Sequence, residues 1–294
     1  MSAPAAHMAE PAPQDVWETL SQDERDAAYN NVAAVANSAA WAAERDELAA
    51  DWRSRHGAKL DLAYGPKPRN RIDLYPSADR DAPCLVFIHG GYWQKNSREV
   101  FAHYAEGAVA AGWSVAMPSH TLAPDASLTE IVAELGEALD WLAREGRQHG
   151  LNGPFVLAGW SAGGHLTTML LGHSSVRAGL AISGVYALGP IRDTFLNAAL
   201  NLTDREVETL SPLSLPVVNK PLAIAYGTAE VPALVRDAQA LHAKRTAEGA
   251  AGPLIPIAGA DHFSILEELR SPDGALTQAA LAILAVAKAR SEAA

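Results

Sequence analysis

The sequence has a single cysteine, Cys84, among its 294 residues. No disulfide can therefore form within the chain, and such cysteine usage is typical of a reducing compartment. The sequence also lacks any apolar run approaching the ~20 residues that a membrane-spanning helix needs. Its Ala- and Pro-rich first dozen residues contain neither a basic leader nor a continuous apolar segment, so we expect no signal peptide. These absences predict a cytoplasmic protein that does not enter a membrane.

Positive charge is also scarce. The 23 lysines and arginines are outnumbered by 34 acidic residues, which gives a net charge of −11. The basic residues are scattered along the chain, whereas nucleic acids and anionic membrane surfaces are bound by clustered ones. We therefore expect neither partner. The sequence contains no HExxH and no paired CxxC pattern, so it predicts no metal site and no cofactor.

What the sequence does contain is a regular alternation of apolar strand patterns and amphipathic helix patterns. The strands are expected near 59–64, 71–75, 84–88, 113–117, 154–158, 179–183, 221–226 and 253–257. Helices are expected near 97–111, 127–146, 164–172, 232–247 and 274–290. This alternation predicts an α/β fold with a mostly parallel eight-stranded sheet and helices on both faces. The Pro-rich turn between the first two strands predicts that this pair is antiparallel.

Two segments fall outside the alternation. We expect residues 1–14 to be disordered, 15–58 to form an N-terminal helical segment, and 59–294 to form the main domain. The N-terminal segment and an insertion at 186–216 both lie where they could cap a site at the edge of the sheet. For the N-terminal segment, simple packing on the core is an equally open interpretation.

Ser161 stands at the centre of a Gly-Trp-Ser-Ala-Gly motif, after an apolar strand pattern and before a helical one. A sharp strand-to-helix turn strains its apex residue and lifts the side-chain oxygen above the sheet. Gly159 and Gly163 fit such a turn, since a Cβ at either position would collide with neighbouring backbone. This context predicts that Ser161 is a nucleophile, and it makes residues 59–294 a catalytic domain.

A second glycine motif, His-Gly-Gly-Tyr-Trp-Gln at 89–94, follows the strand pattern at 84–88. Glycines at a strand exit let backbone N–H groups point at a ligand. A serine that attacks a carbonyl creates an oxyanion, which needs two or three such donors. We therefore predict an oxyanion hole made by the backbone N–H groups of Gly91, Tyr92 and Ala162. We expect His89 to brace this loop by hydrogen bonding.

The sequences HGGYWQ and GWSAGGHL together resemble the α/β-hydrolase fold. Within it, they resemble the arylformamidase (kynurenine formamidase) branch near the hormone-sensitive-lipase-like esterases. The resemblance covers about residues 60–285. Many esterases share the HGG and GxSAGG elements, whereas the Tyr-Trp-Gln continuation is narrower and favours a formamidase. Esterases commonly carry a third glycine where this chain has Tyr92, so we expect an aromatic ring to crowd the oxyanion loop.

A serine nucleophile needs a base, and His262 is the predicted one. It follows the strand pattern at 253–257 and therefore lies at the same sheet edge as Ser161. His173 and His242 lie within helical patterns and are expected at the surface. His165, on the helix after Ser161, is expected to serve packing.

The acid that orients the base is predicted to be Glu230, in the loop after the strand at 221–226. The resemblance agrees, because the related motif carries an Asp or Glu just after this Tyr-Gly pair. Asp237 is a rival, but its surroundings look helical, which would carry it away from the sheet edge. Asp261 is the other rival, although adjacent side chains in an extended loop point apart.

The resemblance implies a serine hydrolase that cleaves an aryl formamide, N-formyl-L-kynurenine, to kynurenine and formate in tryptophan catabolism. A short-chain carboxylesterase or another aromatic amidase is the alternative enzyme, and a catalytically silent binding module is the alternative of another class. The partner is then a small aromatic amide or ester. Relatives are often dimers, so a homodimer is compatible with the resemblance, although no surface stripe in the sequence indicates one. The candidate substrate-binding residues are Tyr92, Trp93, Trp160 and Phe263, with Arg98 and Arg192 as candidates for binding a substrate carboxylate.

Overall fold

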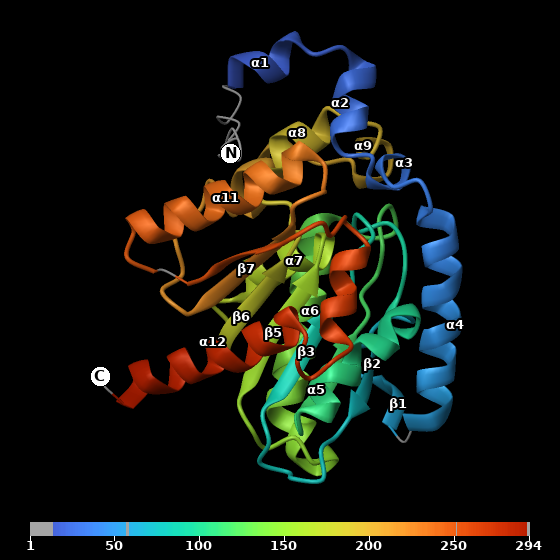
Figure 1. Cartoon of the computed structure of the whole chain (residues 1–294), viewed down its shortest axis with the longest axis vertical. Helices are drawn as coiled ribbons and strands as arrows, with labels where there is room; N and C mark the ends of the chain where they lie inside the picture. Colours follow the sequence, from blue (N-terminus) through green and yellow to red (C-terminus); the bar gives the residue numbers. More distant parts are fainter. Residues whose placement is uncertain (1–13, 57–58, 251, 293–294) are drawn as a thin grey trace, which may run out of the picture.

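The computed structural model describes residues 14–56, 59–250 and 252–292. An eight-stranded sheet lies at its centre, with the strand order β1-β2-β4-β3-β5-β6-β7-β8 (Figure 1). The β1–β2 and β2–β4 pairs are antiparallel, and the pairs from β4 onward to β8 are parallel. The predicted strands and the antiparallel first pair are thus confirmed. The strands are β1 (Lys59–Ala63), β2 (Arg71–Tyr75), β3 (Cys84–Ile88), β4 (Ser114–Pro118), β5 (Phe155–Trp160), β6 (Val176–Ile182), β7 (Leu222–Gly227) and β8 (Leu254–Ile257).

Both faces of the sheet are covered, because its central strands are apolar on both sides. In β3, Val86 and Ile88 belong to one core, whereas Leu85 and Phe87 belong to the other. The first core includes residues of α6 (Leu128–Glu145), α7 (Ala162–Leu170) and α11 (Pro232–Ala247). The second includes residues of η1 (Arg98–Ala105), α5 (Glu106–Ala110), η3 (Ser264–Leu269) and α12 (Ala275–Glu292). This arrangement is the layered one that the sequence predicts, and it leaves the carboxyl ends of the strands to carry a site.

One predicted helix differs in the structure. The stretch expected as a single helix over 97–111 is the 3-10 helix η1 followed by the short helix α5. In η1 the buried side chains include Arg98, Phe101 and Tyr104, which stand three residues apart. A 3-10 helix has three residues per turn and so aligns these three on one side. The sequence pattern alone does not separate this period from that of an α-helix.

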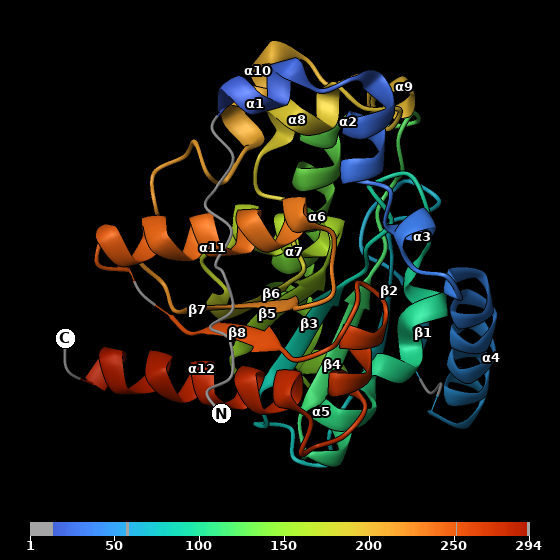
Figure 2. The same ribbon diagram turned by 45° about the horizontal axis from the view of Figure 1, so that its top comes forward.

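The N-terminal segment forms four helices: α1 (Gln14–Thr19), α2 (Gln22–Ala28), α3 (Asn31–Ala34) and α4 (Ser38–His56). A capping box of Ser21 with Glu24 starts α2, and the Asn30 side chain caps α3. These caps explain why one predicted helical region is divided. The last helix, α4, packs along η1 (Figure 2). Residues 1–13 of the terminus expected to be disordered, and residues 57–58, lie outside the described residues.

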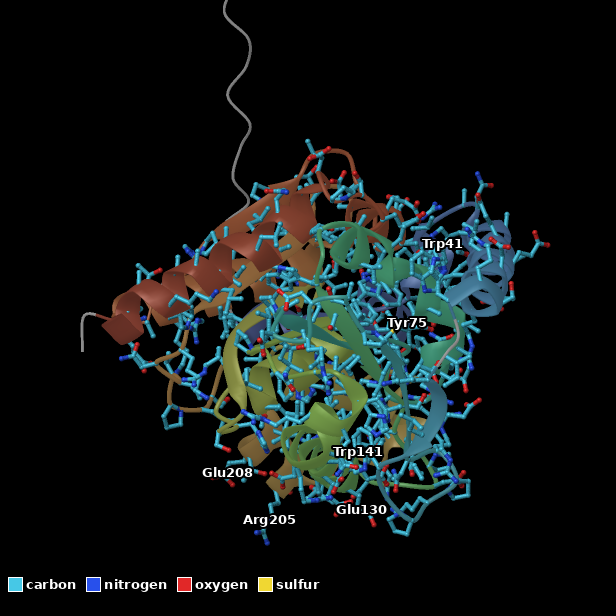
Figure 3. The ribbon with its side chains drawn as sticks, turned by 90° about the horizontal axis from the view of Figure 1, so that it is seen from below. Trp41, Tyr75, Glu130, Trp141, Arg205 and Glu208 are labelled. Carbon is cyan, nitrogen blue, oxygen red and sulfur yellow. The ribbon has the colours of Figure 1, made fainter. Side chains whose placement is uncertain are left out.

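The insertion at 186–216 contains α8 (Leu188–Arg192), α9 (Asn197–Leu200) and α10 (Asp204–Leu210). Figure 2 shows α1 and α2 beside these helices. The indole of Trp17 donates to Asp193 Oδ2 at 2.9 Å, and the backbone N–H of Phe195 donates to Asp26 Oδ1 at 2.8 Å. The two segments outside the strand-helix alternation are therefore tied to each other. On the outer side of α10, Arg205 and Glu208 project away from the body (Figure 3).

Candidate active site

Ser161 occupies the sharp turn between β5 and α7. Its backbone has φ 58° and ψ −119°, a left-handed conformation that is strained for a residue with a side chain. A Cβ on Gly159 would stand 2.2 Å from the carbonyl oxygen of Gly163, and one on Gly163 would stand 2.1 Å from that of Ile88. Glycine is therefore required at both positions. The turn is held from β6, whose residue Ile182 accepts a hydrogen bond from the Ser161 N–H at 2.8 Å.

His262 lies within hydrogen-bonding distance of Ser161. Its Nε2 is 3.1 Å from the Ser161 Oγ, although 101 residues separate the two in sequence. The indole of Trp160 donates to the carbonyl oxygen of His262 at 2.8 Å, and the two rings lie 4.7 Å apart. Asp261 accepts from the backbone N–H groups of Phe263 and Ser264, so its carboxylate fixes the turn after β8 and is not directed at the imidazole. Ser161 and His262 thus lie together, as expected from their positions after two strands of the same sheet.

Glu230 follows β7 and lies on the other side of the imidazole. Its Oε1 is 3.8 Å from His262 Nδ1, which is longer than a hydrogen bond. The same oxygen accepts hydrogen bonds from the Ser183 hydroxyl and from the Gly227 N–H, the latter at 3.2 Å. The other carboxylate oxygen and the Nδ1 atom are both buried, with no hydrogen-bond partner among the described residues.

The rival acid, Asp237, serves the insertion. Its Oδ2 accepts from the backbone N–H groups of Tyr186 and Ala187 at 2.6 and 3.2 Å. Burial raises the pKa of Asp237 to about 6. Because this carboxylate is already held by two amides, it anchors the start of the insertion to α11.

Ser183 is a residue that the sequence reasoning missed. It follows β6 at the carboxyl edge of the sheet, has φ 50°, and is fully buried. The signal was available, since a Ser-Gly pair directly after a predicted strand lies at the edge where Ser161, Glu230 and His262 were placed. The hydroxyl of Ser183 contacts the carboxylate of Glu230, so it belongs to the same cluster.

The loop at 89–94 has the backbone expected of an anion-binding turn. Gly91, Tyr92 and Trp93 all have positive φ, at 122°, 49° and 59°. Within the described part of the chain, no acceptor is paired with the backbone N–H of Gly91, Tyr92 or Ala162. These are the three donors predicted for an oxyanion hole. At the start of the loop, the Nδ1 atom of His89 lies 3.0 Å from the carbonyl oxygen of Gly90.

The ring of Tyr92 is fixed by the N-terminal segment. Its hydroxyl donates to the carbonyl oxygen of Tyr29 at 2.7 Å and accepts from the side-chain amide of Asn31 at 3.0 Å. The side chain of Gln94 donates to the carbonyl oxygen of Leu196 in the insertion at 2.8 Å. Tyr92 and Gln94 of the motif therefore link the loop to the N-terminal segment and to the insertion. The sequence indicates neither partner, because both contacts join segments that are distant in the chain.

The aromatic residues predicted to bind substrate are buried or partly buried. Trp93 and Trp160 are buried in the two cores, and Phe263 packs on Trp41 of α4 with ring centroids 4.7 Å apart. Trp41 is labelled in Figure 3. Little of the serine and the histidine is accessible to solvent, since Ser161 is 2% exposed and His262 is 3% exposed. Contact of these aromatic rings with a substrate stays a prediction.

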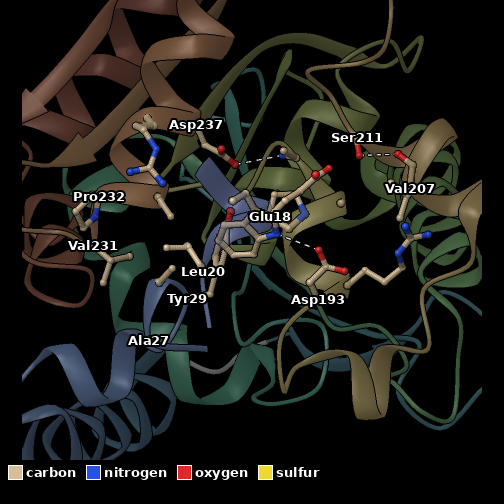
Figure 4. Close-up of a pocket in the computed structure, with 18 of the residues that line it drawn as sticks. Glu18, Leu20, Ala27, Tyr29, Asp193, Val207, Ser211, Val231, Pro232 and Asp237 are labelled. Carbon is tan, nitrogen blue, oxygen red and sulfur yellow. Dashed lines mark hydrogen bonds between the residues drawn. The ribbon is translucent and has the colours of Figure 1, made fainter. Parts of the chain in front are cut away.

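A large cavity lies next to this cluster, not inside it (Figure 4). Its volume is about 980 Å³, and its lining includes Tyr29 of the N-terminal segment, Ala187 of the insertion and Val231 before α11. Ser161 and His262 are not among the lining residues. The Ser161–His262 pair, with its 3.1 Å contact, therefore lies outside the cavity lining.

Comparison with known proteins gives the family. The BD-FAE family model matches residues 72–181. Kynurenine formamidase from Salmo salar is 26% identical over 242 residues, which are 76% of this chain and 81% of that protein. The crystal structure of a proposed thioesterase from Silicibacter sp. TM1040 superimposes with a TM-score of 0.78 at 30% identity, covering 88% of this chain and 99% of that one. The chain belongs to the α/β-hydrolases, in their group of arylformamidase-like esterases. Esterase B from Lactobacillus rhamnosus shares the fold, with a TM-score of 0.68 at 20% identity.

Other residues of this α/β-hydrolase have structural partners. Arg98 is buried and ion-paired with Asp73 at 2.8 Å, so it is not free to bind a substrate carboxylate, and that expectation is wrong. Arg192, at the cavity, is ion-paired with Asp204. His165 is buried on α7 and donates from Nε2 to the carbonyl oxygen of Leu210 at 2.7 Å, which agrees with its expected structural role.

In residues 14–56, 59–250 and 252–292, no group of three or more His, Cys, Asp or Glu side chains has the arrangement of a metal site. None of the helices in this part of the chain has the length and apolar character to cross a membrane.

Proposed function

We propose that this hydrolase uses Ser161 as its nucleophile and cleaves an aryl formamide, N-formyl-L-kynurenine, to kynurenine and formate. The observation that carries the mechanism is the 3.1 Å contact between Ser161 Oγ and His262 Nε2, next to backbone amides without acceptors. The substrate is supported by the kynurenine formamidases of Salmo salar and Danio rerio, which match 76% of this chain at 26% and 24% identity.

In the first half of the reaction, His262 removes the hydroxyl proton of Ser161 while the Oγ attacks the formyl carbon. The negative charge that forms on the formyl oxygen is stabilised by the N–H groups of Gly91, Tyr92 and Ala162. The protonated imidazole then gives its proton to the aryl nitrogen. The C–N bond breaks and kynurenine leaves.

In the second half, a water molecule loses a proton to His262 and attacks the formyl ester on Ser161. The tetrahedral intermediate collapses, formate leaves, and the serine oxygen regains its proton from the imidazole. No metal or cofactor takes part in either half of this scheme. The imidazole acts as base and then as acid in each half, so its orientation determines the rate.

Glu230 orients the imidazole in this scheme. Its carboxylate stands 3.8 Å from His262 Nδ1, and both the Nδ1 atom and the second carboxylate oxygen lack partners. Hydrogen bonds at catalytic residues are often long in the free enzyme and shorten when a substrate or transition state is bound. We expect Glu230 to close this distance as the positive charge develops on the ring.

A direct kinetic comparison tests the proposal. The purified protein is incubated with N-formyl-L-kynurenine and with a series of formyl, acetyl and butyryl anilides and esters. The proposal expects kynurenine release and a preference for the formyl group. A hydrophobic pocket discriminates against each added methylene by only ~1–3 kcal/mol, so the preference is a graded one. Efficient cleavage of short p-nitrophenyl esters with no action on N-formyl-L-kynurenine would refute it.

The second candidate is a short-chain carboxylesterase. It is favoured by an esterase from Gibberella moniliformis, which is 30% identical over 115 residues and matches 38% of this chain. The same serine and histidine would act, but an ester has an alkoxide leaving group that needs less protonation than an amine. The substrate series above separates the two candidates, because an esterase would cleave the butyryl esters faster than any formamide.

A further inference from the structure

The large cavity beside the candidate site is bounded by three segments of the chain. These are the N-terminal helices from Trp17 to Tyr29, the insertion from Ala187 to Ser214, and the start of α11 from Val231 to Asp237. Figure 4 shows labelled residues from all three around one space. The volume of about 980 Å³ falls at the upper end of the range typical of small-molecule sites.

Three residues that line this cavity are linked, by sequence or by hydrogen bonds, to the residues of the proposed mechanism. Val231 lines the cavity and directly follows Glu230. Tyr29 lines it as well, and its carbonyl oxygen holds the hydroxyl of Tyr92. Asp237 lines it and holds the N–H of Tyr186, three residues after Ser183. These relationships place the cavity on the Glu230 and Tyr92 side of the proposed catalytic residues.

The two arginines on the cavity wall differ in their ion pairing. Two cations, Arg192 and Arg236, and three carboxylates, Glu18, Asp193 and Asp237, line the cavity. Arg192 is ion-paired with Asp204. Among the described residues, the half-buried Arg236 guanidinium forms no ion pair and donates no hydrogen bond. Burial raises the pKa of the nearby Asp237, and the charge of Arg236 acts to lower it. Its neighbour Asp237 gives its carboxylate to backbone amides, as described above.

An unpaired, partly buried guanidinium is a recognition group for a carboxylate, because its planar donors match the two carboxylate oxygens. The chain carries an excess of carboxylates, with a net charge of −11, yet none in its described residues forms an ion pair with this guanidinium. Near the same cavity, Trp17 and Tyr29 meet edge to face at 5.9 Å, which provides an aromatic wall. The combination suits an aryl group that carries an acid.

We propose that this cavity receives the leaving group of the substrate and that Arg236 binds its carboxylate. The chemical class is an aromatic amine or phenol that bears an amino-acid side arm. This inference rests on the proposed function for the position of the reacting carbonyl. It assigns Arg236 to substrate binding, with no part in the bond-breaking step.

The test compares Arg236→Gln with Arg192→Gln, which removes the other cavity cation. Each variant is assayed on N-formyl-L-kynurenine and on its α-carboxamide, which lacks only the negative charge. For Arg236→Gln we expect a KM for the acid that is about 10- to 100-fold higher, with kcat nearly unchanged and no change for the amide. For Arg192→Gln we expect a change of less than about threefold, as for an exposed ion pair.

A second substrate pair separates this inference from the proposed function. O-acetyl-L-tyrosine and its amide are aromatic esters with the same difference in charge. If the native protein cleaves these esters but not N-formyl-L-kynurenine, the formamidase proposal fails, while the KM ratio of the ester pair still tests Arg236. Equal KM changes for the charged and neutral substrates, or an equally large effect of Arg192→Gln, would overturn the assignment. Arg236→Lys, which keeps the charge and loses the planar fork, is expected to lie between the native protein and Arg236→Gln.

Discussion

The hydroxyl of Ser183 donates a hydrogen bond to Oε1 of Glu230, the same oxygen that stands 3.8 Å from His262 Nδ1. Two residues from the ends of neighbouring strands, β6 and β7, are thus joined in a fully buried position. The contact holds the carboxylate oxygen that faces the imidazole. Ser183 therefore acts as a positioning residue for the acid in the proposed mechanism.

Ser183→Ala is expected to lower kcat about tenfold with little change in KM. The physical reason is that a hydrogen bond to a buried charged group contributes ~1.5–3 kcal/mol, and its loss frees the carboxylate to leave the imidazole. The rate of fluorophosphonate labelling should fall by the same factor, because it depends on the same base. Ser175→Ala, at a partly exposed serine that contacts His173, serves as the control. An unchanged kcat in Ser183→Ala would remove Ser183 from the account.

Glu230→Gln is expected to cost far more activity than Asp237→Asn. The glutamine cannot stabilise the imidazolium, so we expect kcat to fall by at least ~100-fold. Asp237→Asn keeps an oxygen for the Tyr186 N–H and should retain most activity. Steady-state kinetics on both variants makes the comparison. The reverse order would transfer the role of the acid to Asp237.

Tyr92→Phe removes the hydroxyl that joins the oxyanion loop to the N-terminal segment. The carbonyl oxygen of Tyr29 and the amide of Asn31 then lose their partner, so we expect the free energy of unfolding to fall by about 1–3 kcal/mol. Turnover should fall severalfold, because the left-handed backbone of this loop loses its anchor. Urea unfolding and kcat are the measurements. Tyr75→Phe is the control, since the buried Tyr75 hydroxyl has no hydrogen-bond partner among the described residues and its loss should be nearly neutral.

The stability of the protein should fall as the pH is lowered from about 6.5 to about 4. Burial lowers the pKa of both His120 and His165 from 6.5 to about 4. Because the folded-state pKa lies below the unfolded value, each neutral ring stabilises the fold above pH 6.5 by about 3 kcal/mol, and this contribution is lost as the pH falls toward 4.

Asp237 acts in the opposite sense, since burial raises its pKa to about 6, and it offsets part of the loss. Urea unfolding between pH 7.5 and 4 measures the net slope, and His165→Asn should flatten it. A slope that is the same with and without His165 would contradict the assignment.

Much of this architecture follows from local pattern. The strands end where apolar runs end, and the parallel sheet brings those ends to one edge, so strand ends together with the family resemblance predicted that Ser161, Glu230 and His262 lie near one another. Gly159 and Gly163 could be recognised because the turn leaves no room for a Cβ, as the structure bears out. These features depend on residues close in sequence and on one general rule about parallel sheets.

The parts that the sequence did not indicate depend on contacts between distant segments. The partners of the Tyr92 hydroxyl lie 61 and 63 residues away. The ion pair of Arg98 with Asp73, which excludes Arg98 from the site, depends on how η1 packs against β2. That Arg236 has no ion-pair partner among the described residues could not be predicted either, because it depends on which carboxylates of distant segments reach it in three dimensions.

Mapping of fluorophosphonate labelling tests the central claim most directly. The native protein is treated with the probe, digested, and the modified peptide is identified by mass spectrometry. We predict modification of Ser161 alone, none in Ser161→Ala, and strongly slowed labelling in His262→Ala, with the loss of N-formyl-L-kynurenine hydrolysis running in parallel. Turnover that persists in Ser161→Ala, or a native enzyme that hydrolyses its substrate without labelling at Ser161, would contradict the account.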